Sequence, residues 1–366
     1  MDDPKRDDPL RDDPTRARQI DVARHAGVSL ATVDRVLHRR PGVHARTLAR
    51  VEAAIRALDY RPDPAASRLA TGRTERLGML LPAGNNPFIA MLADQVRAAA
   101  PWLADQRALA SVTSVDVFAP QQLAEALLEC GRSHDAVIVM GNDHPVVREA
   151  IDEIVDQGTV VVTLVSDVPA SRRQRFVGID NVAAGRTAAT LLGRFLCPRS
   201  RPAPPRDADA PRLPVAIVAG SLSLRDHAER CFGFGQVIGT EYPTLQLLPP
   251  IEAFDDSERS EALTEALLER TPGIVGVYSA GAGNRGIAAA LRQRERAGRI
   301  VYIAHELTPF ARRFLLDGVI DAVISQDAGH EIRSACRIAL ALLRDEAVLT
   351  DQERIRIDVF LKDNLP

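Results

Sequence analysis

The sequence has few of the residues that build disulfide frameworks, metal sites or aromatic surfaces. Its 366 residues include four cysteines, one tryptophan and 4% aromatic residues in total. No two cysteines form a Cys-x-x-Cys pair and the eight histidines form no His-Glu-x-x-His pattern, which argues against zinc and thioredoxin-type sites. Scattered single thiols are typical of a reducing compartment. We therefore expect no metal and no cofactor.

Long apolar runs and an apolar leader are also missing. No apolar run reaches the roughly 18 residues that a membrane span needs. The N-terminus lacks the apolar stretch of a secretory signal peptide. These absences predict a cytoplasmic protein without a membrane partner. The length of the chain and its 46% hydrophobic content suit two or three folded domains.

The net charge of -3 conceals an asymmetry along the chain. Residues 16–73 hold 12 arginines against 5 acidic residues, a net charge of +7, so the remainder carries -10. A basic segment on an acidic body is typical of a protein that contacts phosphate at one end only. Residues 1–15 repeat Asp-Asp-Pro three times, and we expect a disordered tail there because proline and like charges oppose packing.

The basic segment begins with the pattern of two short helices, at 20–26 and 30–38, joined by a tight turn. Gly27 in the turn is free to adopt a positive φ angle, and Ser29 is a suitable N-cap for the second helix. Apolar side chains repeat at helical spacing and are expected to face inward: Ile20, Val22 and Ala23, then Val33, Val36 and Leu37. A third helix is expected at 46–58, with apolar Leu48, Val51, Ala54, Ile55 and Leu58. This arrangement predicts a helix-turn-helix DNA-binding domain over residues 16–60.

The second helix carries the residues expected to contact DNA. Leu30 and Ala31 lie at its N-terminal end, where such helices meet base edges in the major groove. Arg35 is suited to a two-pronged contact with guanine O6 and N7. Two hydroxyl residues, Ser29 and Thr32, suit phosphate oxygens, which fix register and not sequence. The exposed side of this helix also carries His38.

From residue 77 onward, strand-like apolar runs alternate with helical runs. Strands are expected at 77–81, 136–140, 160–164, 215–218, 274–278, 300–303 and 322–325, with a last one near the C-terminus. Helices are expected at 88–100, 121–130, 146–157, 183–196, 227–239, 257–270, 284–296 and 327–344. Alternating βα units predict parallel, doubly wound sheets, and the number of strands suits two sheets. A stretch with six prolines, 197–214, interrupts the pattern as a surface loop.

Several fixed patterns in this chain point to one known family. The first is Asp21-Val-Ala-x-x-Ala-Gly-Val-Ser-x-x-Thr-Val-x-Arg-Val-Leu37, which is followed by Pro41-Gly-Val43 and Leu58-x-Tyr60. Farther along the chain stand Asn85-Asn-Pro-Phe88, Gly178-Ile-Asp-Asn-x-x-x-Gly185, and Arg230 before Gly233-Phe234. With these residues the chain resembles the LacI/GalR (lac repressor) family. The resemblance implies an all-α helix-turn-helix head and an α/β periplasmic-binding-protein-like body with two doubly wound parallel-sheet lobes.

The resemblance also implies how the chain is divided and what it binds. A hinge is expected at 61–74 and a ribose-type sugar-binding body at 75–366. The first lobe would take about 75–165 and 327–345, and the second about 166–326 and 350–366. In this family the hinge becomes helical on a specific operator and a leucine enters the minor groove, and Leu69 matches that position. Paired hinges imply a homodimer on double-stranded DNA with a near-palindromic operator.

The cleft between the two lobes is the expected ligand site, because ligands bind at the carboxyl ends of parallel strands. The resemblance assigns the polar contacts to Asn86, Asp143, Arg230, Asn284, Glu306 and Gln326, and the flat apolar face to Phe88. Carboxylates accept hydrogen bonds from hydroxyl pairs and a guanidinium donates two in parallel. This mixture favours a neutral monosaccharide or polyol as effector. The expected function is therefore a regulator, by family default a repressor of sugar genes, and not an enzyme.

Three positions depart from the family pattern. Asp34 stands where many members carry a small hydroxyl residue. A carboxylate repels phosphate but can accept a hydrogen bond from cytosine N4, which leaves the half-site preference open. Glu306 stands where aspartate is usual, and Gly283-Asn284 replaces an Asn-Asp pair. The ring size and stereochemistry of the sugar are therefore not predicted, nor is whether the effector releases the protein from DNA or recruits it.

An enzyme is the main alternative interpretation. Gly281-Ala-Gly-Asn-Arg-Gly286 matches the Gly-x-Gly-x-x-Gly pattern of dinucleotide sites, with Glu306 20 residues farther along. A single match of this kind is weak, and the same turn lines the sugar cleft in the resembling family. Ser221 lies in no Gly-x-Ser-x-Gly pattern, and Asp143 with Glu306 would be the acid and base of a hydrolase. A periplasmic carrier is a third class, which the basic head and the missing leader disfavour.

Overall fold

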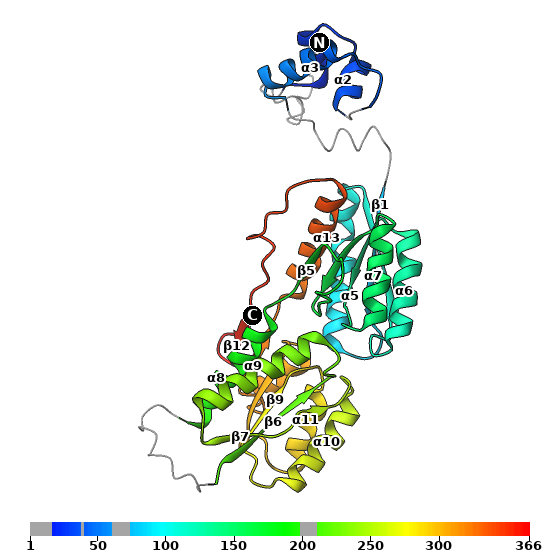
Figure 1. Cartoon of the computed structure of the whole chain (residues 1–366). Helices are drawn as coiled ribbons and strands as arrows, with labels where there is room; N and C mark the ends of the chain where they lie inside the picture. The colour runs from blue at the N-terminus through cyan, green and yellow to red at the C-terminus, as the bar shows by residue number, and fades with distance from the viewer. Residues whose placement is uncertain (1–16, 38–39, 61–73, 198–210) are drawn as a thin grey trace, which may run out of the picture. The chain divides into compact units, whose positions relative to one another are not determined.

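The computed structural model describes residues 17–37, 40–60, 74–197 and 211–366. The chain divides into two compact units, residues 1–73 and 74–366, which we call the head and the body (Figure 1). The tail expected at 1–15, His38, and the hinge up to residue 73, with Leu69 in it, lie outside the described residues. Within the described ranges, no helix combines the length and the apolar character that crossing a membrane requires.

The head contains three helices, α1 (Gln19–Ala26), α2 (Leu30–Leu37) and α3 (Ala45–Ala57). Its core consists of buried Val22, Ala23, Ala26, Val33, Val51 and Ala54. The expectation that Ile20 and Leu48 face inward was wrong, since these side chains are 45% and 38% exposed. At 100° per residue, Ile20 lies roughly 110° from the centre of the face formed by buried Val22, Ala23 and Ala26, which leaves it at the edge of the core.

The turn between α1 and α2 is fixed from both sides. Gly27 has a φ of 60°, a left-handed conformation that glycine adopts without strain. Ser29 Oγ accepts a hydrogen bond from the Thr32 amide at 3.2 Å, which confirms the expected N-cap. From α3, Arg50 donates to the carbonyls of Ala26 and Gly27. The third helix therefore locks the angle between the first two.

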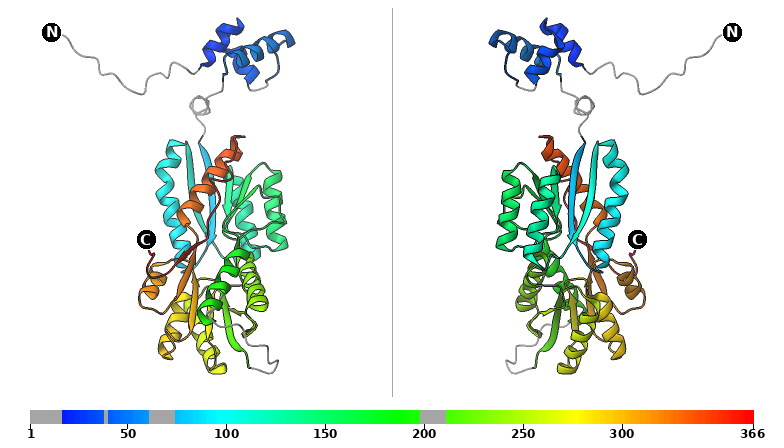
Figure 2. Two further views of the ribbon diagram at one scale, coloured as in Figure 1. Left: turned by 90° about the vertical axis from the view of Figure 1, so that its left-hand side faces the viewer. Right: turned by 90° about the vertical axis from the view of Figure 1, so that its right-hand side faces the viewer.

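The first lobe of the body is built on a parallel five-stranded sheet with the order β2-β1-β3-β4-β5. Its strands are β1 (Glu75–Pro82), β2 (Ala108–Val115), β3 (Ala136–Val139), β4 (Val160–Leu164) and β5 (Arg175–Val177). One face is covered by α5 (Pro87–Asp105) and α13 (Ala328–Leu343), and the other by α6 (Pro120–Ser133) and α7 (Pro145–Asp156) (Figure 2). The two faces have separate apolar cores, as a doubly wound sheet requires.

The second lobe has the strand order β12-β11-β10-β9-β6-β7, with β8 also paired to β6. Its strands are β6 (Leu213–Ala219), β7 (Leu245–Leu247), β8 (Ile251–Glu252), β9 (Gly276–Ser279), β10 (Val301–His305), β11 (Ala322–Ser325) and β12 (Asp358–Phe360). Its helices are α8 (Asn181–Leu196), α9 (Arg225–Glu241), α10 (Ser257–Arg270), α11 (Asn284–Gln293) and α12 (Pro309–Leu316). All pairs are parallel except β11 with the edge strand β12.

The chain passes between the lobes after β5, after β11 and after α13. We expected the first segment of the first lobe to end near residue 165, but the sheet of this lobe continues to Val177. The short strand β5 escaped sequence analysis because only three residues pair there. One apolar core holds residues from both sheets, including Met79 and Ile217, so the lobes are packed against each other.

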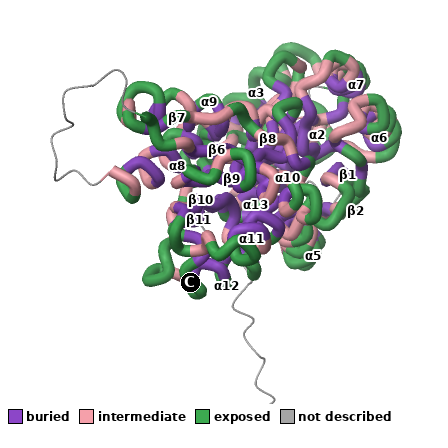
Figure 3. The backbone as a smooth tube through the Cα atoms, turned by 90° about the horizontal axis from the view of Figure 1, so that it is seen from below, coloured by how far each residue is buried: buried purple, intermediate pink, exposed green. Residues whose placement is uncertain are grey.

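Two glycines bring α8 and α9 of the second lobe into close contact. A Cβ atom on Gly185 would lie 2.0 Å from the Arg230 carbonyl oxygen, and one on Gly233 would lie 2.1 Å from the carbonyl of Val182. Only glycine allows this approach. Seen from below, the backbone of α8 and α9 alternates between buried and exposed stretches (Figure 3). The close contact sets the position of Arg230, which faces the cleft.

Candidate functional site

The outer surface of α2 presents most of the side chains that the sequence predicted for DNA contact. Leu30, Ala31 and Arg35 are exposed, and Leu30 keeps 45% of its surface open although it is apolar. The hydroxyls of Ser29 and Thr32 lie 2.9 Å apart and bond each other. Both hydroxyls therefore help to fix the start of α2.

Asp34 is not an isolated negative charge on this surface. Its Oδ2 accepts a hydrogen bond from Arg40 at 3.3 Å, in a pair whose side chains are 40% and 62% exposed. An exposed pair of this kind has a small energy and opens readily. The ion pair offsets part of the repulsion that a carboxylate on α2 would exert on phosphate.

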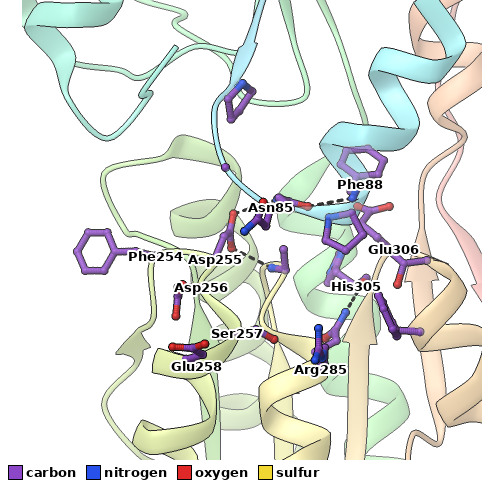
Figure 4. Close-up of a pocket in the computed structure, with 18 of the residues that line it drawn as sticks. Asn85, Phe88, Phe254, Asp255, Asp256, Ser257, Glu258, Arg285, His305 and Glu306 are labelled. Atoms are coloured by element: carbon purple, nitrogen blue, oxygen red, sulfur yellow. Dashed lines mark hydrogen bonds between the residues drawn. The ribbon is translucent and has the colours of Figure 1, made fainter. Parts of the chain in front are cut away.

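A cleft of about 590 Å³ lies between the lobes of the body, where loops at the carboxyl ends of β1, β8, β9 and β10 meet. This volume falls in the range of small-molecule sites. Four of the seven ligand residues predicted from sequence line it: Asn86, Phe88, Asn284 and Glu306. Phe88 and Glu306 are labelled in Figure 4. A second cavity of about 20 Å³ adjoins it and is lined by Arg230 and Gln326. The structure thus brings six of the seven together.

Asn86 joins the two lobes at the edge of the cleft. Its Oδ1 accepts from the Phe88 amide at 2.9 Å, which caps α5, and its Nδ2 donates to Asp255 Oδ2 at 3.3 Å. Asp255 belongs to the second lobe and also accepts from the Ala282 amide at 2.9 Å. The Phe88 ring follows directly and is 4% exposed. An apolar face and an amide are therefore held side by side by the start of one helix.

Arg230 is buried beneath the cleft, and two of its three nitrogens donate to the protein. Nε donates to Asn181 Oδ1 at 2.8 Å and Nη1 to the Ala280 carbonyl at 3.0 Å. Nη2 has no hydrogen-bond partner among the described residues, and it lies 3.8 Å from Asp226 Oδ2. The expectation that Arg230 offers two parallel donors to a ligand was therefore wrong. One nitrogen is left, because the others hold α9 against α8 and β9.

Glu306 and Gln326 form a pair at the ends of β10 and β11. Gln326 Nε2 donates to Glu306 Oε1 at 2.8 Å, and Gln326 Oε1 has no partner in the part of the chain that the structure describes. Glu306 is 6% exposed and has a φ of 65°. Burial raises its pKa to about 7, although the positive charge of Arg230 opposes this rise. The carboxyl group therefore changes charge near neutral pH.

Asn284 and His305 are held by the wall of the cleft. Asn284 Nδ2 donates to the His305 carbonyl at 2.7 Å, and its Oδ1 accepts from the Tyr302 hydroxyl at 2.9 Å. His305 Nε2 lies 2.7 Å from the Tyr278 hydroxyl, while Nδ1 has no partner within the described ranges. Burial, with help from the charge of Arg230, lowers the His305 pKa well below its usual value. This imidazole is therefore neutral.

Asp143 does not line either cavity, in contrast to the sequence prediction. Its Oδ1 accepts from Arg148 Nε at 2.7 Å, and its Oδ2 accepts from Arg225 Nη1 at 3.4 Å. Arg225 belongs to the second lobe, so this carboxylate forms an ion pair across the lobes at the side of the cleft. Both of its oxygens are engaged by arginines and are not offered to a sugar.

Sequence analysis missed several cleft residues. Asp255 and Phe254 follow β8, a two-residue strand, and both have φ angles of 55°. No helical or strand periodicity marks such a segment. Phe118, from the first lobe, meets the Phe254 ring edge-on with centroids 5.5 Å apart. These two rings line the cleft from different lobes and are in contact with each other.

The Gly281-to-Gly286 turn has a structural explanation. A Cβ atom on Gly286 would lie 1.9 Å from the Ser257 carbonyl, and one on Gly283 would lie 2.1 Å from Ser260 Oγ. These two glycines make room for α10 against α11. No group of three potential metal ligands occurs among the residues that the structure describes.

Comparison with known families agrees with this architecture. Residues 77–347 match the periplasmic binding protein domain, which is well over half of the chain. Residues 20–63 match the bacterial regulatory proteins of the lacI family. The chain belongs to the lacI family. The body of the chain is a sensor domain of the periplasmic-binding-protein type.

Curated relatives of this lacI-family protein are regulators. The HTH-type transcriptional regulator RegA of Clostridium saccharobutylicum is 32% identical over 174 residues, which cover 47% of this chain and 50% of that protein. The ribose operon repressor of Escherichia coli K12 is 44% identical over 72 residues, 20% of this chain and 22% of that protein. The chain thus spans about half the length of these relatives, or less. By name they are regulators and repressors, not enzymes.

Solved structures share the fold of the body. GanP, a glucose-galactose binding protein from Geobacillus stearothermophilus, superimposes with a TM-score of 0.69 at 20% identity, over 80% of this chain and 99% of that one. A putative LacI transcriptional regulator from Bacteroides fragilis has a TM-score of 0.66 at 16% identity, with 80% and 98% coverage. At these identities the likeness establishes the two-lobed fold.

Proposed function

We propose that this chain is a sequence-specific DNA-binding regulator controlled by a sugar or polyol, and by family default a repressor of genes for sugar transport or catabolism. It acts in the cytoplasm as a homodimer, and its operator is a near-palindromic DNA sequence. One observation carries the proposal: a helix-turn-helix head and a cleft with unpartnered buried polar atoms occur in the same chain. By their names, the Escherichia coli relative represses a ribose operon and GanP binds glucose and galactose.

The unpartnered atoms support a polyhydroxylated ligand. Arg230 Nη2 is a donor, Gln326 Oε1 is an acceptor, and His305 Nδ1 is either, according to its tautomer. A hydroxyl group donates and accepts, so a polyol satisfies both kinds of atom. Leaving such atoms buried without a partner costs about 1–3 kcal/mol each. A ligand that supplies the missing hydrogen bonds therefore binds more tightly than its apolar contacts alone would allow.

The surface of α2 supports DNA recognition. Leu30 and Ala31 are exposed at the N-terminal end of the helix, and Arg35 lies about one turn farther along. A major-groove helix uses this end to reach base edges. The exposed apolar Leu30 has no role in the core of the head, which favours contact with a thymine methyl group.

The two activities are coupled through the lobes. Asn86–Asp255 and Asp143–Arg225 join the first lobe to the second beside the cleft. A ligand that closes the cleft changes these contacts and the angle between the lobes. It alters DNA affinity only by its differential affinity for the two arrangements, typically 1–3 kcal/mol. Leu69 remains the proposed minor-groove residue, and Leu69→Ala is expected to weaken operator binding without changing sugar binding.

The DNA half of the proposal is tested by selection of bound fragments from the source genome, followed by titration of the best fragment. We expect a palindromic site that is bound at least about 10³-fold more tightly than random duplex. Arg35→Ala should weaken that site about tenfold or more, which is the energy of one guanine contact. Arg56→Ala, an exposed change on α3, is the matched control. Equal affinity for the selected site and random duplex would refute the assignment.

The ligand half is tested by a thermal-shift screen of monosaccharides and polyols on the full chain. A ligand at 100 times its Kd stabilises the folded protein by about 2.7 kcal/mol. Gln326→Ala should abolish the shift, because it removes an acceptor at the base of the cleft. Gln352→Ala, outside the cleft, should retain it. A panel without any shift would contradict the sensor role while leaving DNA binding intact.

A further inference from the structure

The walls of the cleft carry far more negative than positive charge. Among the side chains that line the two cavities, six are carboxylates: Asp226, Asp255, Asp256, Glu258, Glu261 and Glu306. The guanidinium groups that line them are those of Arg230 and Arg285. Of the six carboxylates, only Asp226 lies within 4 Å of a guanidinium in the described part of the chain. Such a cleft repels an anionic ligand and attracts a cation.

The negative charge is concentrated at one end of the cleft. Asp255, Asp256, Glu258 and Glu261, which we call the acidic wall, come from the loop after β8 and the first turns of α10. Figure 4 shows Asp256 and Glu258 beside Phe254 at one end of the pocket, and Phe88 with Glu306 at the other. The cleft therefore has two ends with different chemistry.

Helix capping explains only part of the acidic wall. Asp256 Oδ1 accepts from the Arg259 amide at 2.7 Å, so it is the N-cap of α10. Glu258 lies in the first turn, where the helix dipole favours an acid. Asp255 precedes the cap in a left-handed conformation, and Glu261 lies beyond the first turn with one oxygen on Gln293 Nε2 at 2.7 Å. Capping requires neither of these last two carboxylates.

Two exposed aromatic rings line the cleft. Phe254, which precedes Asp255 in the loop after β8 at the acidic end, is 40% exposed, and Phe310, at the start of α12, is 44% exposed. Each ring already has a guanidinium above it, since Arg259 lies 4.6 Å from the Phe254 centroid and Arg285 lies 5.6 Å from that of Phe310. Carboxylates beside exposed aromatic rings form the chemical environment that binds ammonium groups.

The opposite end holds buried atoms that need partners. Gln326 Oε1 and Asp226 Oδ1 are acceptors without a hydrogen bond in the described residues, and their side chains are 3% and 2% exposed. Arg230 Nη2 is a donor in the same condition. Hydroxyl groups satisfy both kinds of atom, whereas an ammonium group would be repelled by Arg230. The polyol part of a ligand therefore belongs at this end and a cationic part at the acidic wall.

We propose that the effector is an amine-bearing sugar or polyol, with its hydroxyl groups over Phe88 and Glu306 and its ammonium group on the acidic wall. This inference rests on the proposed function, because it names the class of ligand for the same cleft. An ammonium group supplies three donors and a positive charge, so its hydrogen bonds to carboxylates are stronger than those of a hydroxyl. The neutral effector expected from sequence carries no positive charge to offset the four carboxylates of the acidic wall.

The test compares the amine and the neutral forms of two sugars and one polyol on the full chain by titration calorimetry. The probes are D-glucosamine, D-glucose and N-acetyl-D-glucosamine, the corresponding galactose set, and 1-amino-1-deoxysorbitol against sorbitol. We expect one amine to bind at least about tenfold more tightly than both its neutral counterparts, which is the difference of one charge-assisted hydrogen bond. The N-acetyl form keeps the nitrogen but loses the charge, so it separates charge from shape.

Variants locate the ammonium group. Glu258→Gln with Glu261→Gln should reduce the preference for the amine to less than about threefold, because it removes two charges of the acidic wall. Glu265→Gln, on the same helix but outside the cleft, should preserve the preference. A preference that survives the double change would overturn the assigned location.

The outcomes separate this inference from the proposed function. Binding of a neutral sugar with equal or greater affinity than its amine would overturn the inference and leave the sugar-controlled regulator intact. A panel in which neither amines nor neutral sugars bind would overturn both. Tight binding of an amine that raises or lowers operator affinity would support both.

Discussion

Neutralising Glu306 should remove a pH-dependent loss of stability from the body. The carboxyl is 6% exposed and its hydrogen-bond donors both come from Gln326. The charged groups that face it are Arg230, which favours the ionised form, and Asp226, which disfavours it. The fully buried Glu331 on α13 also interacts with it. Burial outweighs the attraction of the arginine and raises the Glu306 pKa to about 7.

The sign follows from the two pKa values. In the unfolded chain the carboxyl loses its proton near 4.5, and in the folded protein it does so near 7. Between these values the unfolded chain binds fewer protons, so the free energy of unfolding falls as the pH rises. A rise from 4.5 to about 7 corresponds to about 3 kcal/mol, at 1.36 kcal/mol per pKa unit. Stability is therefore highest, as far as this group is concerned, below pH 4.5.

Glu306→Gln keeps an oxygen that accepts from Gln326 but cannot ionise. Urea unfolding at pH 5, 6, 7 and 8 should show the variant gaining about 2–3 kcal/mol relative to the parent protein across this range. Glu265→Gln controls for the loss of one negative charge elsewhere in the lobe. Parallel pH profiles for the parent and Glu306→Gln would refute the reasoning, because they would mean that the carboxyl titrates at the same pH in the folded and unfolded chains.

Three further changes test the packing of the fold. Gly185→Ala places a Cβ atom 2.0 Å from a carbonyl oxygen and should lower the free energy of unfolding of the body by about 3 kcal/mol, measured by chemical unfolding. Its control is Gly239→Ala, where the Cβ meets open space, and this change should leave the free energy of unfolding unchanged or raise it by up to about 1 kcal/mol. Gly27→Ala forces alanine into a left-handed conformation and should destabilise the head by about 1–2 kcal/mol, with unchanged unfolding of the body as the control. Arg344→Met leaves the largely buried Glu75 carboxylate unpaired and should lower stability by about 3–5 kcal/mol, and a loss below 1 kcal/mol would show that the pair is immaterial.

The apolar periodicity of the sequence was enough to predict most of the fold. Strands such as β3 and β4 are continuous apolar runs, since helices cover both of their faces. The edge strand β2 was missed because most of its side chains are exposed and its sequence mixes alanine, serine and threonine with valine. The helix α12 is only eight residues long and was also missed. Short and edge elements lack the repeating pattern on which the predictions depended.

The residues that line the cavities were predictable where a residue stands at a fixed position in the resembling family, such as Asn86, Arg230 and Gln326, but their role as ligand contacts remains a prediction. The hydrogen bonds of these residues were not predictable, because they depend on contacts between distant segments. Asp143 was assigned to the ligand, but arginines from both lobes occupy its oxygens. Asp255 was missed because its position follows from the loop after β8, which no periodic pattern marks.

Effector binding in the cleft and DNA binding by the head are linked by a single coupling free energy. The direct measurement is a pair of titrations on the full chain: operator DNA with and without a saturating effector, and effector with and without saturating operator. By thermodynamic linkage the effector must change the Kd for DNA by the same factor as DNA changes the Kd for the effector. We predict equal factors of about 5–150. Operator affinity that does not change when the cleft is filled would contradict the account.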